Sequence, residues 1–188
     1  TDPEGTCNAI SRLLTDLPSL RVLVLRADTE ARAADHPGRA SARAAERLRV
    51  LMSGAGRAGV VVICSMRGHV SGAFLLLGLS AHYRLVDANA TFECDGVDRA
   101  ERDAIMRLLH AEDAQSVLHA TSFDAARALE LGVASELVEG GRLDERTAQF
   151  ASWLARQPAV GVCQMLQLTC GLVQDPWVLS ARGERQEL

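Results

Sequence analysis

The sequence predicts an α/β fold in which buried parallel strands alternate with helices. Two continuous apolar runs, Arg21–Arg26 and Val60–Met66, are typical of strands that are covered on both faces of a sheet. A helical stretch, Ala40–Met52, lies between them, and the order strand, helix, strand predicts a parallel pair with a right-handed crossover. The third observation is that a glycine turn, an apolar helix-like stretch and a short strand ending at Phe92 follow the second run.

Length and composition set the size and the chemistry of the core. The chain has 188 residues, which suits one domain with enough buried surface for a core of its own. Hydrophobic residues make up 48% of the chain and aromatic residues only 4%, so the core must consist mainly of Ala, Leu and Val. Such a composition favours helices and buried strands.

The charge pattern excludes several classes of function. The net charge is −4, so no basic surface indicates a nucleic-acid partner or an anionic membrane. All twenty basic residues are arginine. The absence of lysine excludes a Schiff-base lysine and a Walker-type phosphate loop. A phosphate group must therefore be bound by arginine or by backbone amides.

The cysteines and the apolar runs indicate a cytoplasmic protein. The five cysteines are odd in number and contain no C-x-x-C pair, which is typical of reduced thiols in the cytoplasm. No apolar run reaches the roughly 20 residues of a membrane span, and no signal peptide is visible. His110 and His119 show no metal-ligand spacing. We therefore expect cytoplasmic localisation, no membrane partner and no metal.

The first element along the chain is a predicted helix at Thr6–Leu17. Its apolar residues recur at helical spacing, and Pro18 marks its end. The strand Arg21–Arg26 then leads into residues 27–39, which have the composition of a turn region with its strongest break at His36-Pro37-Gly38. One helix and one strand therefore precede the crossover helix.

The stretch from Arg67 to Phe92 is the most informative part of the chain. Gly68 and Gly72 predict a turn after the second strand, and the apolar residues that follow predict a buried helix. A helix that begins at such a turn leaves backbone N–H groups unpaired at its N-terminus, where the helix dipole favours an anion. A site of this kind can hold the oxyanion of a thioester enolate.

A polar loop, residues 93–103, comes next, and the rest of the chain is mainly helical. Six further helices are expected: Ala104–His110, Asp113–His119, Asp124–Leu131, Leu143–Gln157, Ala159–Leu172 and Trp177–Arg185. Ser122 or Asp124 is the expected N-cap of the third of these helices, and Gly132 ends it. Val133–Val138 is a short predicted strand. Proline precedes each of the last two helices, where a missing N–H costs little.

Three blocks stand out when the chain is read as a whole: RVLVLR, VVVICSMRGHVSGAFLLLGLSAHYRLVDANATF and SFDAARALELGVASELVEGGRL. In this order they resemble the crotonase (enoyl-CoA hydratase/isomerase) superfamily. The first block is similar to the strand before the family's first oxyanion-hole loop. The second is similar to its strand, glycine turn, helix and "D-x-R-I-A … A-x-F" stretch, and the third to its "A-x-x-A-x-x-x-G-L-V-x-x-V" stretch and following helix.

The resemblance implies a fold, an assembly and a substrate class. It implies a crotonase-like (ClpP/crotonase) α/β fold, with a ββα-superhelix core over residues 1–140 and a C-terminal helical trimerisation region over residues 141–188. Family members form trimers or dimers of trimers. They bind acyl-CoA or acyl-carrier thioesters and hold the thioester oxygen with two backbone amides. No separate cofactor is implied, because coenzyme A or the carrier's phosphopantetheine belongs to the substrate.

The sequence also departs from the family pattern at functional positions. The G-G-G turn reads Gly72-Ala73-Phe74, and the first hydratase glutamate is replaced by Leu76. The second hydratase glutamate lies in a "P-E" after the A-x-F strand, where this chain has Glu93-Cys94-Asp95-Gly96 and no P-E. The aspartate of "D-x-R-I-A" is His82, and the first oxyanion loop, A-F-x-x-G-x-D, is not recognisable in residues 27–39.

Five residues are the candidates for an active site. The resemblance implies that Ala73, next to Gly72, donates an oxyanion-hole amide; the alternative is that Gly72 only lets a helix pack closely on a strand. His69 is a candidate acid or base, or a turn histidine whose ring bonds to a nearby carbonyl. Glu93 or Asp95 could replace a lost carboxylate, or both could be solvated loop charges.

The departures from the family pattern restrict the reactions that we expect this chain to catalyse. Hydration of an alkene normally needs paired carboxylates, so a lyase or isomerase that lacks both glutamates is expected to decarboxylate a β-carboxyacyl thioester or to move a double bond. By analogy, such variants belong in secondary metabolism. The first alternative is a non-catalytic crotonase-fold partner or thioester-binding subunit. The second is a serine peptidase of the related Clp-type fold, with Ser71 as nucleophile.

Overall fold

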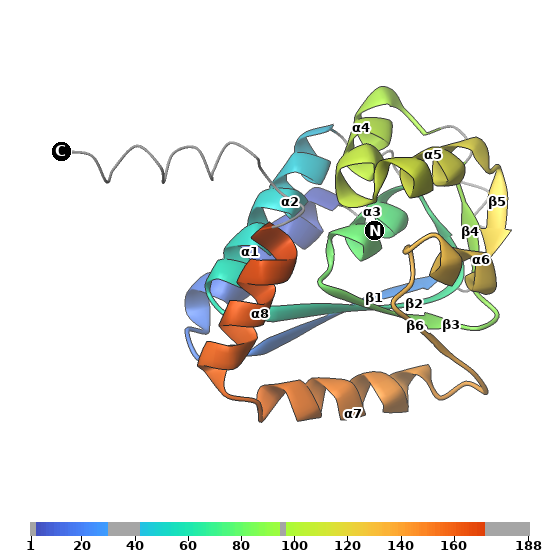
Figure 1. Ribbon diagram of the computed structural model, residues 1–188. Coiled ribbons are helices and arrows are strands. Elements are labelled where there is room, and N and C mark those ends of the chain that lie inside the picture. The colour runs from blue at the N-terminus through green and yellow to red at the C-terminus, as the bar shows by residue number, and fades with distance from the viewer. Residues whose placement is uncertain (1–2, 30–41, 95–96, 172–188) are drawn as a thin grey trace.

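The computed structural model describes residues 3–29, 42–94 and 97–171, which form an α/β fold around a curled sheet (Figure 1). The helices are α1 (Pro3–Asp16), α2 (Ala42–Arg57), α3 (Gly72–Ser80), α4 (Arg99–Leu108), α5 (Ala111–His119), α6 (Ala125–Glu130), α7 (Leu143–Ala155) and α8 (Ala159–Gly171). The strands are β1 (Val22–Thr29), β2 (Val61–Ser71), β3 (Tyr83–Asp87), β4 (Thr91–Glu93), β5 (Ser122–Asp124) and β6 (Glu136–Val138). Within these three ranges, no helix is both long enough and apolar enough to cross a membrane.

Strand β2 organises the sheet because it pairs with three other strands. Its residues Val61–Gly68 pair in parallel with β1, and Ile63–Met66 pair in parallel with β3. Its remaining residues, His69–Ser71, pair in parallel with β4. β6 extends the sheet beyond β3, and β5 lies antiparallel to β4. A single strand therefore connects a larger parallel sheet to a small ladder of β2, β4 and β5.

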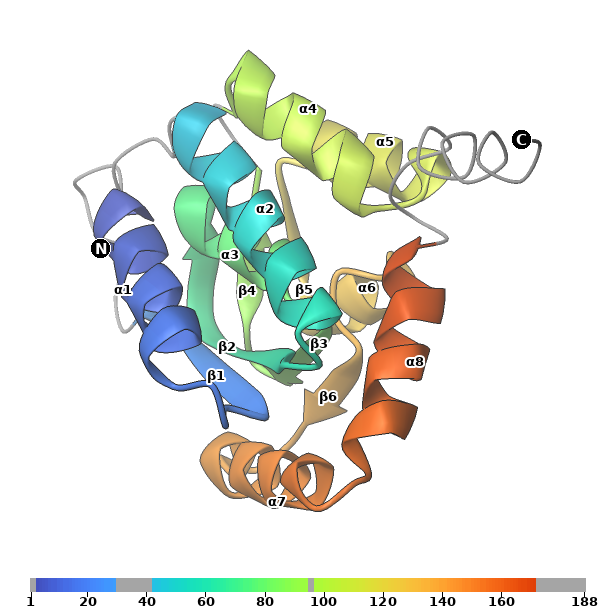
Figure 2. The same cartoon turned by 90° about the vertical axis from the view of Figure 1, so that its left-hand side faces the viewer.

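Helices cover both faces of the larger sheet. α7 lies across one face and contacts β1, β2 and β3, whereas α1, α2 and α3 lie on the opposite side (Figure 1). Figure 2 shows α8 beside α2, after the chain has turned away from α7. This arrangement confirms the predicted α/β class and the parallel pair joined by a helical crossover.

The continuous apolar run of β2 is explained by burial on both faces. Val62, Cys64 and Met66 belong to the larger core cluster, which the sheet shares with the helices on its α2 and α3 side. Val61 and Ile63 belong to a second cluster, with Leu143 and Phe150 of α7 packed in it. Because side chains alternate across a strand, an almost entirely apolar run is needed when both faces are covered. Ser65, the polar residue within this run, is buried and donates to the Leu25 carbonyl at 3.4 Å.

Most predicted helices and strands are confirmed, with small shifts at their ends. The N-cap of α6 is Asp124, whose side chain accepts a hydrogen bond from the Arg127 amide at 2.8 Å. Ser122, the alternative cap, begins β5 instead. Gly132 follows α6 with a φ of +67°, in the left-handed region that glycine reaches without strain.

The predicted glycine turn between Gly68 and Gly72 is wrong. β2 continues through Gly68 to Ser71, so His69 lies on a strand and not in a turn. Gly68 has a φ of +74° inside the strand. It is the last β2 residue paired with β1, and the pairing passes to β4 at the next residue. Glycine in a strand interior often marks such an irregularity, where the direction of the strand changes.

The predicted polar loop at residues 93–103 is also wrong at both ends. Glu93 closes β4, and α4 begins at Arg99, five residues before the expected Ala104. The missed signal is a capping box: the Asp98 carboxylate accepts from the Glu101 amide, and the Glu101 side chain accepts from the Asp98 amide. The spacing Asp-x-x-Glu resembles the established Ser/Thr-x-x-Glu pattern for a helix start.

Several sequence predictions fall outside the described residues. They are the break at 36–38, most of the region expected to hold the first oxyanion loop, the helix Trp177–Arg185 and Asp95. The division into a core (1–140) and a trimerisation region (141–188) stays a prediction.

Two helical glycines are expected to respond in opposite directions to alanine. A Cβ built on Gly78 of α3 lies 2.5 Å from the Met66 sulfur, whereas one built on Gly54 of α2 meets nothing within 4 Å. Gly78→Ala should therefore destabilise the protein by about 1–3 kcal/mol through overpacking. Gly54→Ala should stabilise it by about 0.5–1 kcal/mol through helix propensity. Urea unfolding followed by circular dichroism measures both, and a Gly78→Ala protein as stable as Gly54→Ala would contradict the close packing of α3 on β2.

Candidate active site

Helix α3 begins where β2 ends. Gly72, its first residue, has a φ of +50°, and the preceding Ser71 has an extended backbone at φ −147° and ψ 165°. The Ser71 side chain makes no capping hydrogen bond. The amide of Ala73 lies in the first turn, where a helix offers no carbonyl four residues earlier. The start of α3 therefore presents backbone donors that its N-cap side chain does not occupy.

The ladder of β2 and β4 has one apolar and one polar face. Val70 and Phe92, which are opposite each other in the register, are fully buried. Side chains alternate along strands, so their neighbours His69, Ser71, Thr91 and Glu93 belong to the other face. In the register, His69 is opposite Thr91 and Ser71 is opposite Glu93. β5 continues both faces, with Phe123 stacked on Phe92 at a centroid distance of 5.2 Å.

Two of the predicted site residues are brought together on the polar face. Nε2 of His69 shares a hydrogen bond with Oε2 of Glu93, and Nδ1 lies 3.2 Å from Oγ1 of Thr91. Both ring nitrogens therefore meet side-chain oxygens, in place of the carbonyl contact considered for a turn histidine. The His69 and Glu93 side chains are 27% and 28% exposed, so the pair is partly shielded and still accessible.

Thr91 was missed by the sequence reasoning. The signal was available, because Thr91 precedes Glu93 by two residues on a strand and therefore shares its face. Asp95, the remaining acidic candidate, lies outside the described residues. The structure therefore joins His69, Thr91 and Glu93 next to the N-terminus of α3.

Two other sequence positions are clarified by their surroundings. Leu76, at the position of the first hydratase glutamate, is 2% exposed and belongs to the core. The two ring-nitrogen contacts of His69 are with Thr91 and Glu93 and not with Ser71, so these contacts do not make His69 the base that the peptidase alternative needs. Neither residue supports two-carboxylate or serine-nucleophile chemistry.

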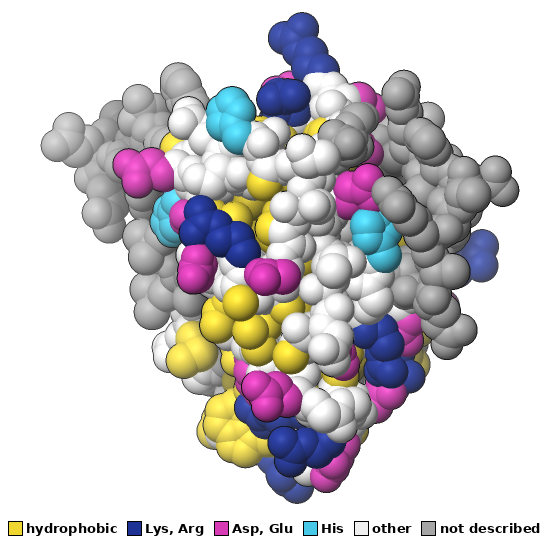
Figure 3. Space-filling view, turned by 90° about the vertical axis from the view of Figure 1, so that its right-hand side faces the viewer, with side chains coloured by type: hydrophobic (Ala, Val, Ile, Leu, Met, Phe, Trp, Pro, Cys, Tyr) yellow, Lys and Arg dark blue, Asp and Glu magenta, His cyan; other side chains and the backbone are white. Residues whose placement is uncertain are grey.

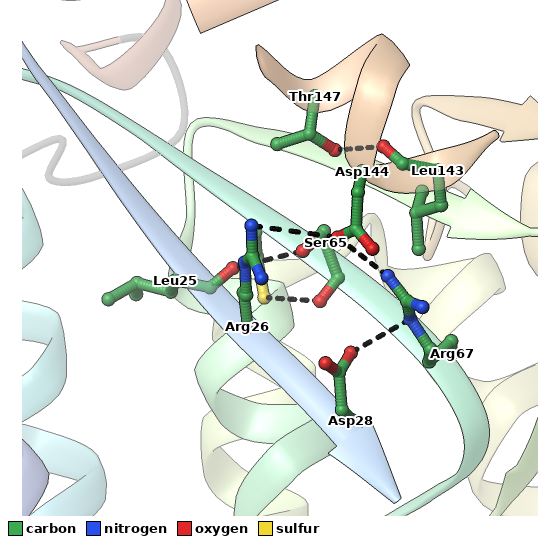
Figure 4. A network of polar contacts seen from close by, with 9 residues as sticks. Leu25, Arg26, Asp28, Ser65, Arg67, Leu143, Asp144 and Thr147 are labelled. Atoms are coloured by element: carbon green, nitrogen blue, oxygen red, sulfur yellow. Dashed lines mark hydrogen bonds and ion pairs between the residues drawn. The ribbon is translucent and has the colours of Figure 1, made fainter.

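A network of arginine and aspartate side chains fixes the strand segment that leads to the site (Figure 4). Arg67 of β2 pairs with Asp28 of β1 at 3.1 Å and with Asp144 of α7 at 2.7 Å. Arg26 approaches the same Asp144 at 3.6 Å. The hydrogen bond from Arg67 lowers the pKa of Asp144 from its ordinary value. The network joins β1, β2 and the first turn of α7, and its β2 member, Arg67, directly precedes Gly68.

The surface around the small ladder is chemically mixed. Figure 3 shows the side of the molecule on which β4, β5 and α6 lie, with histidine, acidic and basic side chains among apolar ones. Within residues 3–29, 42–94 and 97–171, no three His, Cys, Asp or Glu side chains are grouped so that they could hold a metal ion. The expectation that no metal takes part stays a prediction.

A cavity of about 800 Å³ lies away from this polar face. Residues from Leu79 to Arg84 line it, so it is at the C-terminal end of α3, whereas Gly72 is at the other end. The cavity also borders α2, α7 and α8. His69 and Glu93 are not part of its lining.

His82, the departure from the family's aspartate, lines this cavity as a neutral imidazole. Its Nδ1 accepts a hydrogen bond from the Val62 amide at 2.9 Å, and its own amide donates to the Val62 carbonyl at 2.9 Å. Burial, with a smaller contribution from the Arg84 charge, lowers the pKa of His82 from 6.5 to about 4. The proton of the neutral ring is therefore on Nε2.

His82 is expected to make the protein less stable as the solution becomes acidic. An unfolded chain takes up a proton at His82 below about pH 6.5, and the folded chain does so only near pH 4, so stability falls between these two values. The pKa difference corresponds to about 3 kcal/mol, present in full above pH 6.5 and lost near pH 4. His82→Asn keeps an acceptor for the Val62 amide and does not titrate. Urea unfolding at pH 4 to 7 should therefore show a flatter profile for the variant; parallel profiles would contradict the prediction.

No family model matches the sequence, and no curated protein matches it either. Solved structures do match. The Pseudomonas aeruginosa protein PA4980 is 24% identical over 100% of this chain and 88% of its own, with a TM-score of 0.72. An enoyl-CoA hydratase/isomerase family protein from Silicibacter pomeroyi is 18% identical over 96% of this chain and 84% of its own, with a TM-score of 0.73. An enoyl-CoA hydratase from Mycobacterium smegmatis is 19% identical over 95% of this chain and 76% of its own, with a TM-score of 0.71.

These similarities confirm the fold predicted from the three sequence blocks. The chain has the fold of the enoyl-CoA hydratase/isomerase (crotonase) proteins, and its sequence is only 18–24% identical to the three named above. At such identities the comparison concerns the fold, and the chemistry has to be argued from the residues of this chain.

Proposed function

We propose that this crotonase-fold chain is a divergent member of the superfamily that acts on an acyl-CoA or acyl-carrier thioester and stabilises its enolate at the N-terminus of α3. The observation that carries the proposal is the start of α3 at Gly72, without a capping side chain, directly after the strand whose His69 contacts Glu93 of β4. An oxyanion is stabilised by hydrogen-bond donors that are already in position before it forms. A nearby acid or base is required only if the reaction also moves a proton.

The backbone supplies the first donor. The amide of Ala73 lies in the first turn of α3, where the helix dipole adds partial positive charge. β1 ends at Thr29, which is opposite Gly68 in the register. The end of β1, after which the family places its second donor, therefore lies beside the part of β2 that leads to α3. Removal of one oxyanion donor typically lowers kcat by about 10²–10³-fold, so two amides can supply much of the catalysis.

The missing carboxylates favour decarboxylation. Leu76 is packed in the core, which removes the first of the two carboxylates needed to activate water. In a β-carboxyacyl thioester, the bond between the α-carbon and the carboxylate breaks, carbon dioxide leaves, and the electron pair forms the enolate. The α-carbon then takes a proton from Nδ1 of His69, which exchanges its contact with Thr91 for the substrate and regains the proton from water, while Glu93 holds Nε2 and orients the ring.

The proposed chemistry is tested with purified protein and malonyl-type thioesters in deuterated water. Release of carbon dioxide together with one deuterium at the α-carbon of the product is the expected result. Tight binding of acyl-CoA without turnover would contradict catalysis and favour the alternative of a non-catalytic partner. That alternative requires a stoichiometric complex with an enzyme whose rate then increases, and a pull-down followed by a rate measurement identifies it.

Oligomerisation is part of the same proposal. Several large apolar side chains of the C-terminal helices are exposed: Trp153 at 51%, Val160 at 70% and Met165 at 68%. Monomeric proteins rarely expose several large apolar side chains together, and a homotrimer or a dimer of trimers would cover them. Sedimentation velocity distinguishes both assemblies from a monomer.

A further inference from the structure

The cavity beside the C-terminal end of α3 is lined by a cation that is partly buried, with its Nε fully shielded from solvent. Its walls are mainly apolar and include Leu79, Phe150, Trp153 and Val162. Arg84 of β3 also lines it. Nη1 of Arg84 donates to the Ala81 carbonyl at 3.0 Å, and Nη2 donates to the Gly132 carbonyl at 3.2 Å. Both partners are neutral, so these bonds hold the guanidinium in place without cancelling its charge.

Arg84 lacks a compensating anion in the described part of the chain. No Asp or Glu of residues 3–29, 42–94 and 97–171 forms an ion pair with it, and its Nε is buried without a hydrogen-bond partner there. Burial lowers the pKa of Arg84 from its ordinary value, as expected for a desolvated cation. Buried charges in proteins are normally paired, because an isolated one is costly.

The groups nearest to Arg84 are neutral at physiological pH. Burial raises the pKa of the Cys64 thiol to about 12, so Cys64 carries no negative charge. His82 is an uncharged ring for the reasons given above. Glu136, which accepts a hydrogen bond from Tyr83 of the lining, is already bound by Arg146 as well. The charge of Arg84 therefore remains available to a ligand.

His82 adds a second polar group to the cavity. The Val62 amide occupies its Nδ1, which leaves Nε2–H as the donor. The other polar side chains whose bonds are defined are already engaged: Ser80 donates to the Leu76 carbonyl and Gln157 to the Trp153 carbonyl. A ligand thus meets an apolar wall, one neutral N–H donor and one fixed positive charge.

We propose that this cavity binds an apolar carboxylate, with the hydrocarbon against α7 and α8 and the carboxylate beside Arg84 and His82. The volume of about 800 Å³ is within the range of small-molecule sites, which are mostly apolar and have a few convergent polar groups. A carboxylate supplies the negative charge that Arg84 lacks and accepts a hydrogen bond from Nε2–H. This site is separate from the N-terminus of α3 and does not depend on the proposed thioester chemistry.

The experiment compares decanoate with two uncharged analogues, decanol and methyl decanoate. Isothermal titration calorimetry measures their binding to the full chain, and quenching of tryptophan fluorescence gives a second readout because Trp153 lines the cavity. Decanoate is expected to bind at least about tenfold more tightly than either analogue, a ratio that corresponds to one charge-assisted hydrogen bond. Equal affinity for all three compounds would overturn the role of Arg84.

Three variants locate the site. Gly161→Leu places a side chain at the cavity lining, where a Cβ meets nothing within 4 Å, and should weaken decanoate binding at least about tenfold. Gln164→Leu, on the same helix and not in the lining, is the matched control and should leave binding unchanged. His82→Asp keeps an acceptor for the Val62 amide and adds a negative charge near Arg84, so it should abolish the preference for the carboxylate.

Each of these measurements has a result that would overturn the proposal. If decanoate does not bind to the folded wild-type chain, or binds equally well to Gly161→Leu, the cavity is not its site. Sedimentation velocity with and without decanoate shows whether the ligand and a second copy of the chain compete for the cavity, and an assembly that dissociates when decanoate binds would contradict the proposal. Circular dichroism of each variant confirms that loss of binding is not loss of folding.

Discussion

Replacement of His69 by alanine is expected to lower kcat for thioester decarboxylation by about 10²–10⁴-fold, the usual contribution of a positioned acid or base. The proton moves only during the reaction, so kcat and kcat/KM should fall together while thioester affinity is retained. Glu93→Gln keeps the size of the side chain that holds the ring and removes its charge, so its loss should be smaller. Stopped-flow detection of carbon dioxide measures both variants.

His119→Gln is the matched control for this prediction. His119 is exposed in the last turn of α5 and is no part of the proposed proton transfer, so its loss should leave kcat unchanged. If His69→Ala retains the wild-type kcat while wild-type protein releases carbon dioxide, the proton comes from another source. In that case the amides of α3 would still account for enolate stabilisation, and only the role of the His69–Glu93 pair would be wrong.

Replacement of Phe92 by alanine is expected to destabilise the fold by about 3–5 kcal/mol. Phe92 is completely buried and stacks on Phe123 with an interplanar angle of 7°. This loss is a large part of the roughly 5–15 kcal/mol that stabilises a typical domain. Phe92→Leu keeps most of the volume and should lose less. Urea unfolding followed by circular dichroism measures all three proteins.

The same substitution should also affect the site. Phe92 lies between Thr91 and Glu93, whose side chains hold the two nitrogens of the His69 ring. A cavity under β4 lets this strand shift, so activity should fall even in the folded fraction. Leu129→Ala, at a position 43% exposed, is the control and should change stability by no more than about 0.5 kcal/mol. A Phe92→Ala protein that unfolds at the same urea concentration as Leu129→Ala would contradict the described core.

The sequence predicted those parts of the fold whose residues have only one favourable environment. The apolar run of β2 requires cover on both faces, and the structure provides it from α2 and α3 on one side and α7 on the other. Asp124 was identified as a possible cap because its side chain can accept from the first turn of a helix. Local chemistry was sufficient at both places.

The site was predicted only in part, because its geometry depends on long-range pairing. His69 and Glu93 were each identified as candidates, but they meet because β2 passes from β1 to β4 at Gly68, and no local pattern indicates this exchange of partners. Gly68 was interpreted as a turn because glycine is common in both turns and irregular strands. Arg84 was missed because its unbalanced charge is visible only after the surrounding carboxylates have been placed.

The transfer of β2 from one partner strand to another has a consequence for how this chain can evolve. Between Gly68 and Gly72, every second side chain belongs to the core and every other one to the site, so a single inserted or deleted residue would exchange Val70 with His69. This segment can therefore accept substitutions, but it cannot accept insertions or deletions. The sequences of divergent relatives are therefore better aligned in this segment by the number of residues between the two glycines than by residue identity.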